Sequence, residues 1–330
     1  MADIRTRYLG MELRSPLIAA SSGLTDNVEN LRRFEKYDVG AVVLKSLFEE
    51  EIRIEKEAQL QKMSSGGFLY PETLEFYDYH DDYDHESTHQ YIELVKKAKS
   101  AISIPVIASI NCVTADQWTF FPRELELAGA DALELNVFIM PSDLNRTKEE
   151  SEKVYFEIIR EVTRQVKIPV SLKISYYFSD LAIMLKRFSE TAIKGLVLFN
   201  RFYSPDIDIE NLEVTSASVL SHPGDFSNTL RWVGIMYDHV SCDMAASTGV
   251  HDGKTLIKMI LAGAAAVQVA SAFYRNGMDY AGDMIRELRE WMDLKEYAKI
   301  DDFKALMSQN ETGNPAAFQR VQFMKYFRGH

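Results

Sequence analysis

The sequence predicts an α/β protein of the TIM type, a (β/α)8 barrel with long loops after strands 2 and 6. The 330 residues suit one such barrel with insertions. Short apolar runs alternate with amphipathic segments along the chain, which favours parallel strands joined by crossover helices. We therefore expect a single barrel domain over residues 1–330 with a C-terminal helical extension.

The predicted strands are short apolar runs with little polar alternation, as in buried parallel sheets. They span residues 17–21, 41–45, 106–110, 132–137, 170–174, 195–200, 240–245 and 265–270. The helices are expected at residues 28–37, 90–101, 124–128, 149–166, 180–192, 229–239, 254–261 and 280–291, with a short helix at 301–307. Gly40, Gly129 and Gly263 each precede a predicted strand, as expected for left-handed helix stops. The long connections, residues 47–86 and 202–227, follow strands and therefore belong to the barrel mouth.

Charge and cysteine content exclude several classes of protein. The chain has 37 Lys and Arg against 49 Asp and Glu, a net charge of −12 that repels nucleic-acid phosphates and anionic membranes. We expect no nucleic-acid partner and no membrane partner. Cys112 and Cys242 are far apart, form no CxxC motif and suit a reducing compartment. No apolar run is long enough to span a bilayer, and the first residues lack a secretory signal, so a cytoplasmic location is predicted.

The carboxyl ends of the predicted strands carry small residues, amides and lysines. Small residues after strands 7 and 8 let backbone N–H groups approach a phosphate, although ordinary tight turns would use the same residues. No acidic cluster and no His/Cys set has metal-ligand spacing, so we expect no metal. The residues at these ends are Ala20, Ser21, Ser22, Gly23, Lys45, Ser46, Asn111, Cys112, Asn136, Lys173, Asn200, Arg201, Ser247, Thr248, Gly249, Ala270 and Ser271.

Two lysines at strand ends suggest a charged ligand. A buried lysine is costly unless it is paired, so Lys45 and Lys173 predict an anion between them. The alternative is that a lysine forms a salt bridge within the protein. The amides of Asn111, Asn136 and Asn200 both donate and accept hydrogen bonds, which suits the edges of a planar heterocycle.

Seven segments in order resemble the dihydroorotate dehydrogenase family of FMN-dependent barrels, with similarity to its class 1 members. They are residues 15–21, 40–46, 133–136, 169–173, 195–200, 247–250 and 267–272. The resemblance implies FMN as cofactor. It implies that Ala20, Ser21 and Ser46 contact the flavin, and that Lys45 lies at the flavin near the substrate. Asn111 and Asn136 would bind the flavin or the substrate, Lys173 would contact the pyrimidine edge of the flavin, and Asn200 would hold the substrate. The FMN phosphate would be bound by Thr248, Gly249, Ala270 and Ser271. Among these, Lys45, Asn136 and Asn200 are the expected catalytic positions.

The substrate loop departs from the family pattern. Family members oxidise a C–C bond of a dihydropyrimidine, with a Cys or Ser base three residues after the strand-4 asparagine. Here that position is Ile139, which cannot accept a proton. The family asparagine after strand 2 has no counterpart at residues 64–69, and the glycine-rich turn before the sixth helix is replaced at 220–224.

Several residues could replace the missing base. They are Cys112, Ser142, Asp143 and His222. No base is needed if the enzyme reduces an activated alkene, with solvent or Tyr176 or Tyr177 as proton donor.

The sequence therefore favours an FMN-dependent oxidoreductase that acts on CH–CH groups. Hydride would pass between flavin N5 and a C–C bond of dihydroorotate or a related dihydro heterocycle, in pyrimidine biosynthesis if the substrate is that of the family. One alternative is a phosphate-ligand aldolase or isomerase with a Schiff-base lysine. Another is an inert FMN-binding relative. The expected partners are a planar small-molecule substrate, an unidentified electron acceptor and, by resemblance, a second copy in a homodimer.

Overall fold

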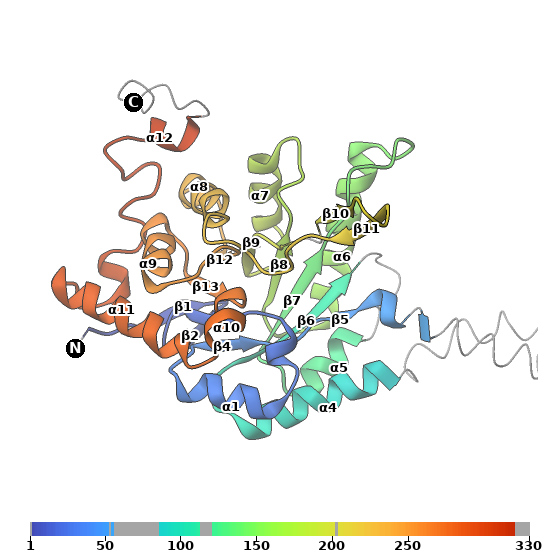
Figure 1. Cartoon of the computed structure of the whole chain (residues 1–330), viewed down its shortest axis with the longest axis horizontal. Helices are drawn as coiled ribbons and strands as arrows, with labels where there is room; N and C mark the ends of the chain where they lie inside the picture. The colour runs from blue at the N-terminus through green and yellow to red at the C-terminus, as the bar shows by residue number, and fades with distance from the viewer. Residues whose placement is uncertain (1, 53, 56–85, 113–120, 202–203, 321–330) are drawn as a thin grey trace, which may run out of the picture.

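The computed structural model is a closed parallel barrel, as the sequence predicts (Figure 1). It describes residues 2–52, 54–55, 86–112, 121–201 and 204–320, and for Cys112 the backbone alone. Around the barrel the strands follow chain order, and pairing of the last with the first closes the sheet. The barrel strands are β3 (Leu17–Ala19), β4 (Ala41–Val43), β6 (Val106–Cys112), β7 (Ala132–Val137), β8 (Val170–Ile174), β9 (Gly195–Leu198), β12 (Asp243–Ser247) and β13 (Ala266–Val269).

Helices separate consecutive barrel strands and cover the outside of the sheet (Figure 1). In chain order they are α1 (Val28–Lys36), α4 (Glu86–Ala101), α5 (Phe121–Leu127), α6 (Lys148–Gln165), α7 (Leu181–Ser189), α8 (Phe226–Met236), α9 (Gly253–Ala262), α10 (Ser271–Asn276) and α11 (Tyr280–Leu294). Side-chain caps begin several of them. Asn27, Thr147 and Asp252 each accept a backbone N–H of the first helical turn.

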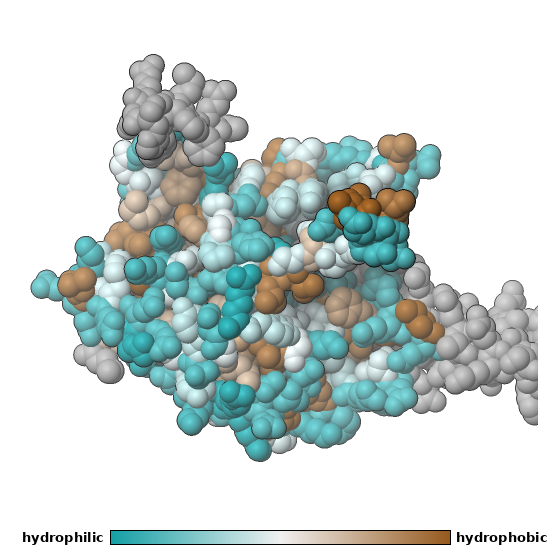
Figure 2. Space-filling view, viewed as in Figure 1, coloured by the Kyte–Doolittle hydropathy of each residue, from teal (hydrophilic) through white to brown (hydrophobic). Residues whose placement is uncertain are grey.

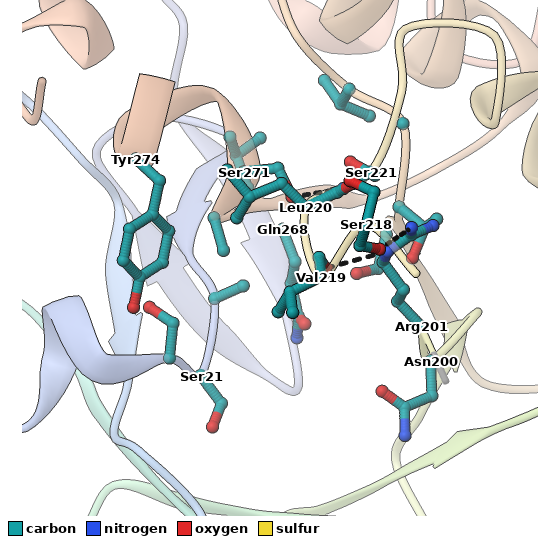
Figure 3. A pocket seen from close by; sticks show the side chains of 18 of the residues that line it. Ser21, Asn200, Arg201, Ser218, Val219, Leu220, Ser221, Gln268, Ser271 and Tyr274 are labelled. Atoms are coloured by element: carbon teal, nitrogen blue, oxygen red, sulfur yellow. Dashed lines mark hydrogen bonds between the residues drawn. The ribbon is translucent and has the colours of Figure 1, made fainter. Parts of the chain in front are cut away.

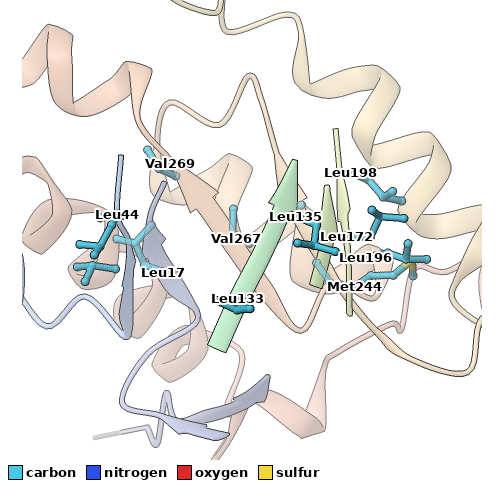
Figure 4. Packing of buried hydrophobic residues seen from close by; sticks show 14 of the residues in the cluster. Leu17, Leu44, Leu133, Leu135, Leu172, Leu196, Leu198, Met244, Val267 and Val269 are labelled. Carbon is cyan, nitrogen blue, oxygen red and sulfur yellow. The ribbon is translucent and has the colours of Figure 1, made fainter. Parts of the chain in front are cut away.

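Successive residues along each barrel strand point to opposite faces of the sheet and join two different cores. Outward residues such as Leu135, Leu172 and Val267 join the large cluster between strands and helices (Figure 4). Inward residues such as Val43 and Val197 join a smaller cluster inside the barrel. The N-terminal strands β1 (Thr6–Tyr8) and β2 (Met11–Leu13) form an antiparallel pair, and Tyr8, Leu9 and Leu13 from this segment add to the inner cluster. This inner cluster leaves the other end of the barrel for a ligand.

Two predicted elements differ from the structure. The seventh barrel strand is Asp243–Ser247 rather than 240–245, because Val240 still donates its N–H to the Met236 carbonyl in the turn that ends α8. The helix expected at 301–307 is only a 3-10 turn, Ile300–Asp302. Ala305 has φ +65°, a left-handed conformation that a continuing helix does not adopt.

Both predicted long connections are present. After β4 the chain forms the short strand β5 (Leu47–Phe48), and most of the connection, residues 56–85, lies outside the described part of the chain. After β9 it forms a hairpin of β10 (Pro205–Asp208) and β11 (Glu213–Ser216), which the sequence did not predict. Apolar side chains gather over this hairpin (Figure 2), with Ile207, Ile209, Leu212 and Val214 all exposed.

Candidate functional site

A cavity of about 580 Å³ opens at the carboxyl ends of the strands (Figure 3). Its walls come from the segments after β3, β9, β12 and β13 and from β8 and β13 themselves. Ser21 and Tyr274 lie on one side, Asn200 and Arg201 on the other, with Gln268 between them (Figure 3). Of the residues expected at the cofactor, those that line the cavity are Ala20, Ser21, Lys173, Asn200, Thr248, Gly249, Ala270 and Ser271.

A buried polar cluster forms part of the cavity floor. Lys173 Nζ lies 3.2 Å from Glu134 Oε1 and donates to Gln268 Oε1 at 3.0 Å. The Gln268 amide donates in turn to Glu134 Oε2. Glu134 and Gln268 are 1% exposed and Lys173 is 6% exposed. The cluster is therefore internally satisfied, and Lys173 still reaches the cavity.

This geometry corrects the argument from lysine burial. Lys173 obtains its counterion from Glu134, so the alternative of an internal salt bridge holds for it. Lys45 lies two residues beyond β4 and is exposed, so its position requires no anion. Neither lysine by its burial alone indicates a ligand.

The strand-end asparagines form a row beside Lys173. Asn111 is opposite Asn136, and Asn136 is opposite Lys173, in the registers of β6, β7 and β8. Asn200 donates its amide N–H to Asn136 Oδ1 at 2.8 Å. Partners on adjacent parallel strands point to the same face, so the amides continue the inner polar layer toward the mouth. The predicted grouping of Asn136 with Asn200 is present.

Ser46 holds the side chain of Ser21 through hydrogen bonds. The Ser21 hydroxyl accepts the Ser46 N–H at 2.9 Å, and the two hydroxyl oxygens are 3.0 Å apart. Ser46 Oγ also lies 2.8 Å from Ser109 Oγ within the barrel. Ser46 is buried and Ser21 lines the cavity. Ser46 thus fixes the Ser21 side chain.

The turn after β12 has an unusual backbone. Thr248 has φ +76° and Gly249 has φ +79°. A Cβ on Gly249 would lie 2.1 Å from the Phe226 nitrogen, so only glycine fits between this turn and the start of α8. The Thr248 hydroxyl donates to the Phe199 carbonyl at 2.9 Å. These constraints hold the turn at the cavity wall.

Residues 218–225, which we call the strap, form another wall of the cavity. Arg201 donates to the carbonyls of Ser218 at 2.7 Å and Val219 at 3.0 Å (Figure 3). It also forms a 3.0 Å ion pair with Asp225. At its middle, Ser221 donates its backbone N–H to Ser271 Oγ at 3.0 Å. Contacts with Arg201 and with Ser271 therefore hold the strap in place.

The candidate bases whose side chains the structure describes do not line this cavity. Ile139 lines a different cavity of about 470 Å³ beside α6, and its backbone N–H donates to the Tyr155 hydroxyl at 3.2 Å. Ser142 and His222 are exposed, and neither lines the 580 Å³ cavity. Asp143 is also exposed and lines the cavity of Ile139. The side chain of Cys112 lies outside the described part of the chain.

A third cavity, of about 520 Å³, adjoins the first. Both are lined by Asn200, Arg201 and Thr248, and the third also by Tyr176 and Tyr177. The rings of these tyrosines are 4.9 Å apart. Burial, followed by the neighbouring Tyr177, raises the pKa of Tyr176, which keeps its hydroxyl protonated at neutral pH.

Several residues at the cavity were not identified from the sequence. Glu134 and Gln268 could have been identified from the sequence, because each is a polar residue at an inward position of a mostly apolar strand. Arg201 lies at a predicted strand end, but its contacts and those of Ser221 depend on how loops meet, which no local pattern indicates. In the described residues no group of three or more His, Cys, Asp or Glu side chains could hold a metal ion. No described helix has the length and apolar composition that a membrane span requires.

Fold and site together define a (β/α)8 barrel with a polar ligand cavity at its mouth. A family model of dihydroorotate dehydrogenase matches residues 3–292. The chain is 27% identical to the dihydroorotate dehydrogenase B (NAD(+)) catalytic subunit of Thermoplasma volcanium, over 92% of this chain and 97% of that relative. It is 23% identical to the subunit of the same name from Methanocaldococcus jannaschii, over 84% and 89%. The chain belongs to the dihydroorotate dehydrogenase family, a family of oxidoreductases.

Proposed function

We propose that the chain is an FMN-dependent oxidoreductase that transfers hydride to or from a C–C bond of a planar dihydro heterocycle. The observation that carries the proposal is that eight of the twelve residues expected at the cofactor, from segments throughout the chain, line one cavity. The family match supports the same class of reaction. When bound, FMN would supply a hydride acceptor or donor at N5 of its isoalloxazine ring.

The residues present fit FMN. The cavity volume of about 580 Å³ is within the range of cofactor sites. Its donors are a lysine ammonium, the Asn200 amide and serine hydroxyls, which suit the carbonyls, ribityl chain and phosphate of the cofactor. We assign Lys173 and Ser21 to the ring system, and Thr248, Gly249, Ala270 and Ser271 to the phosphate.

We assign the substrate to the side of the cavity that Asn200 lines, where Asn136 bonds the Asn200 amide. Their amides are joined by one hydrogen bond and retain further donors and acceptors for a ring edge. Dihydroorotate is the first substrate to test, since relatives carry that name. Lys45 and Asn111 stay proposed contacts of the cofactor or substrate.

A second candidate is the reduction of an activated alkene. It is favoured by Ile139 in the place of the family base and by the protonated Tyr176 in the adjoining cavity. A tyrosine that is protonated at neutral pH has a proton to donate and cannot serve as the base. A Schiff-base reaction at Lys173 is less favourable, because an ammonium that bonds a carboxylate is not a nucleophile.

The partners remain proposals. Relatives are named as catalytic subunits, which suggests an electron acceptor on another chain. We also propose pairing of two copies, for which the exposed apolar hairpin β10–β11 is an available surface.

The test measures reduction of the flavin in the absence of oxygen. Dihydroorotate is added to the flavin-loaded protein, and the loss of oxidised-flavin absorbance is followed in a stopped-flow instrument. The oxidation proposal expects bleaching within seconds. Failure to bleach, combined with reoxidation of the chemically reduced protein by orotate or another activated alkene, would favour the second candidate. No exchange of electrons with any of these compounds would reject both.

A further inference from the structure

Ser221 is the most firmly held residue of the strap. It is 3% exposed and lines the 580 Å³ cavity. Its N–H donates to Ser271 Oγ at 3.0 Å, and its carbonyl accepts from Arg275 Nη2 at 3.1 Å. Its hydroxyl oxygen lies 3.0 Å from Nε2 of His251. The backbone contacts thus fix the position from which the hydroxyl acts.

His251 lies behind Ser221. It follows the turn of Thr248 and Gly249, is 8% exposed and is not among the residues that line the cavity. Burial and the positive charge of Arg275 lower its pKa, against the weaker opposing effects of a hydrogen bond with the Ser221 backbone and of Asp225 and Asp252. The imidazole is therefore neutral at pH 7, with one ring nitrogen protonated.

The direction of this hydrogen bond decides what Ser221 presents to a ligand. If Nε2 accepts, the serine proton points at the histidine, and only lone pairs face the cavity. If Nε2–H donates, the serine proton is free to bond an anion. A phosphate in the cavity stabilises the second arrangement, because a hydroxyl donor to an anion forms a strong hydrogen bond.

We propose that Ser221 is a ligand of the FMN phosphate and that His251 is a positioning residue that turns the serine proton toward it. The inference rests on the proposed function. Residues 220–224 replace a glycine-rich turn of the family pattern, and a serine there adds a side-chain donor that glycine lacks. Ser271, already assigned to the phosphate, is the residue that bonds the Ser221 backbone.

The test compares FMN with riboflavin, which lacks the phosphate. Both are titrated into the flavin-stripped full-length protein, and binding is measured by quenching of flavin fluorescence. Ser221→Ala and His251→Leu are each expected to weaken FMN binding about tenfold, the effect of one lost hydrogen bond to a charged group. Riboflavin binding is expected to change less than twofold.

Two further variants distinguish the loss of the positioning hydrogen bond of His251 from a defect in folding. His251→Gln retains an N–H donor and is expected to bind FMN within about threefold of the native protein. His222→Ala, an exposed neighbour on the strap, should change neither affinity. Equal weakening of FMN and riboflavin by Ser221→Ala and His251→Leu would overturn the inference, as would unchanged FMN binding. A native protein that binds neither flavin would reject the proposed function as well.

Discussion

Lys173 Nζ and Glu134 Oε1 are 3.2 Å apart inside the barrel, and both side chains are almost fully buried. The pair occupies the boundary between the inner apolar cluster and the ligand cavity. Because the lysine charge is balanced by the protein, the cavity floor is stable before any ligand arrives. A ligand at Lys173 thus meets a cation that Glu134 has already partly neutralised.

Breaking this pair should destabilise the protein. Lys173→Met leaves the Glu134 carboxylate buried without its cation, and we expect the free energy of unfolding to fall by about 3–5 kcal/mol. The double variant Glu134→Gln/Lys173→Met removes both charges and should recover at least half of that loss. Urea unfolding of the flavin-free proteins measures both values. A double variant whose loss equals the sum of the single losses would show that the pair is not coupled.

Gly249→Ala should disrupt the turn at the cavity wall. The new Cβ would lie 2.1 Å from the Phe226 nitrogen at a residue with φ +79°. We expect a loss of about 2 kcal/mol or more in unfolding free energy, together with weaker flavin binding. Gly224→Ala is the matched control, since nothing lies within 4 Å of its Cβ position. Equal thermal stability of the two variants would contradict the steric argument.

Introducing a family-type base at position 139 should not speed the oxidation of dihydroorotate. Ile139 lines the 470 Å³ cavity beside α6, which Asn200 does not line, and packs against the outer core. Ile139→Cys is therefore expected to change the rate of flavin reduction by dihydroorotate less than about twofold. Ile139→Val controls for the lost volume. A tenfold gain with cysteine alone would mean that the side chain reaches the substrate.

Cys242 should be unreactive in the folded protein. Burial, followed by the charge of Asp243, raises the pKa of its thiol from 9.0 to about 12. Only the thiolate is nucleophilic, so alkylation by iodoacetamide at pH 8 should be at least 100-fold slower in the folded than in the urea-unfolded protein. The Cys112→Ser background isolates this thiol. Similar rates in both states would show that Cys242 is not protected.

The same shift predicts a loss of stability at high pH. The pKa of the thiol is near its ordinary value of 9.0 in the unfolded protein and about 12 in the folded protein. The contribution of Cys242 is therefore fully present below about pH 9 and is lost as pH rises toward 12. Urea midpoints of the Cys112→Ser protein should fall more steeply across this window than those of Cys112→Ser/Cys242→Ser. Parallel pH profiles would refute the shift.

The sequence predicts the barrel well because parallel strands require nearly continuous apolar runs, and these mark each strand at its centre. Its errors fall where local pattern and tertiary contact diverge. Val240 is apolar and was predicted in a strand, but it belongs to the turn after α8. Lys45 was predicted to be buried at a strand end, but it is exposed. Many residues that line the 580 Å³ cavity lie at strand ends, and their meeting there is therefore predictable. The Arg201 and His251 contacts depend on how distant loops meet, so no local pattern reveals them.

The flavin content of the purified protein tests the central claim most directly. The account predicts a yellow protein that releases one FMN per chain on denaturation, and a Thr248→Glu variant that is folded but colourless, because a carboxylate at the cavity wall repels the phosphate. A native protein that is colourless and takes up no added FMN would contradict the account.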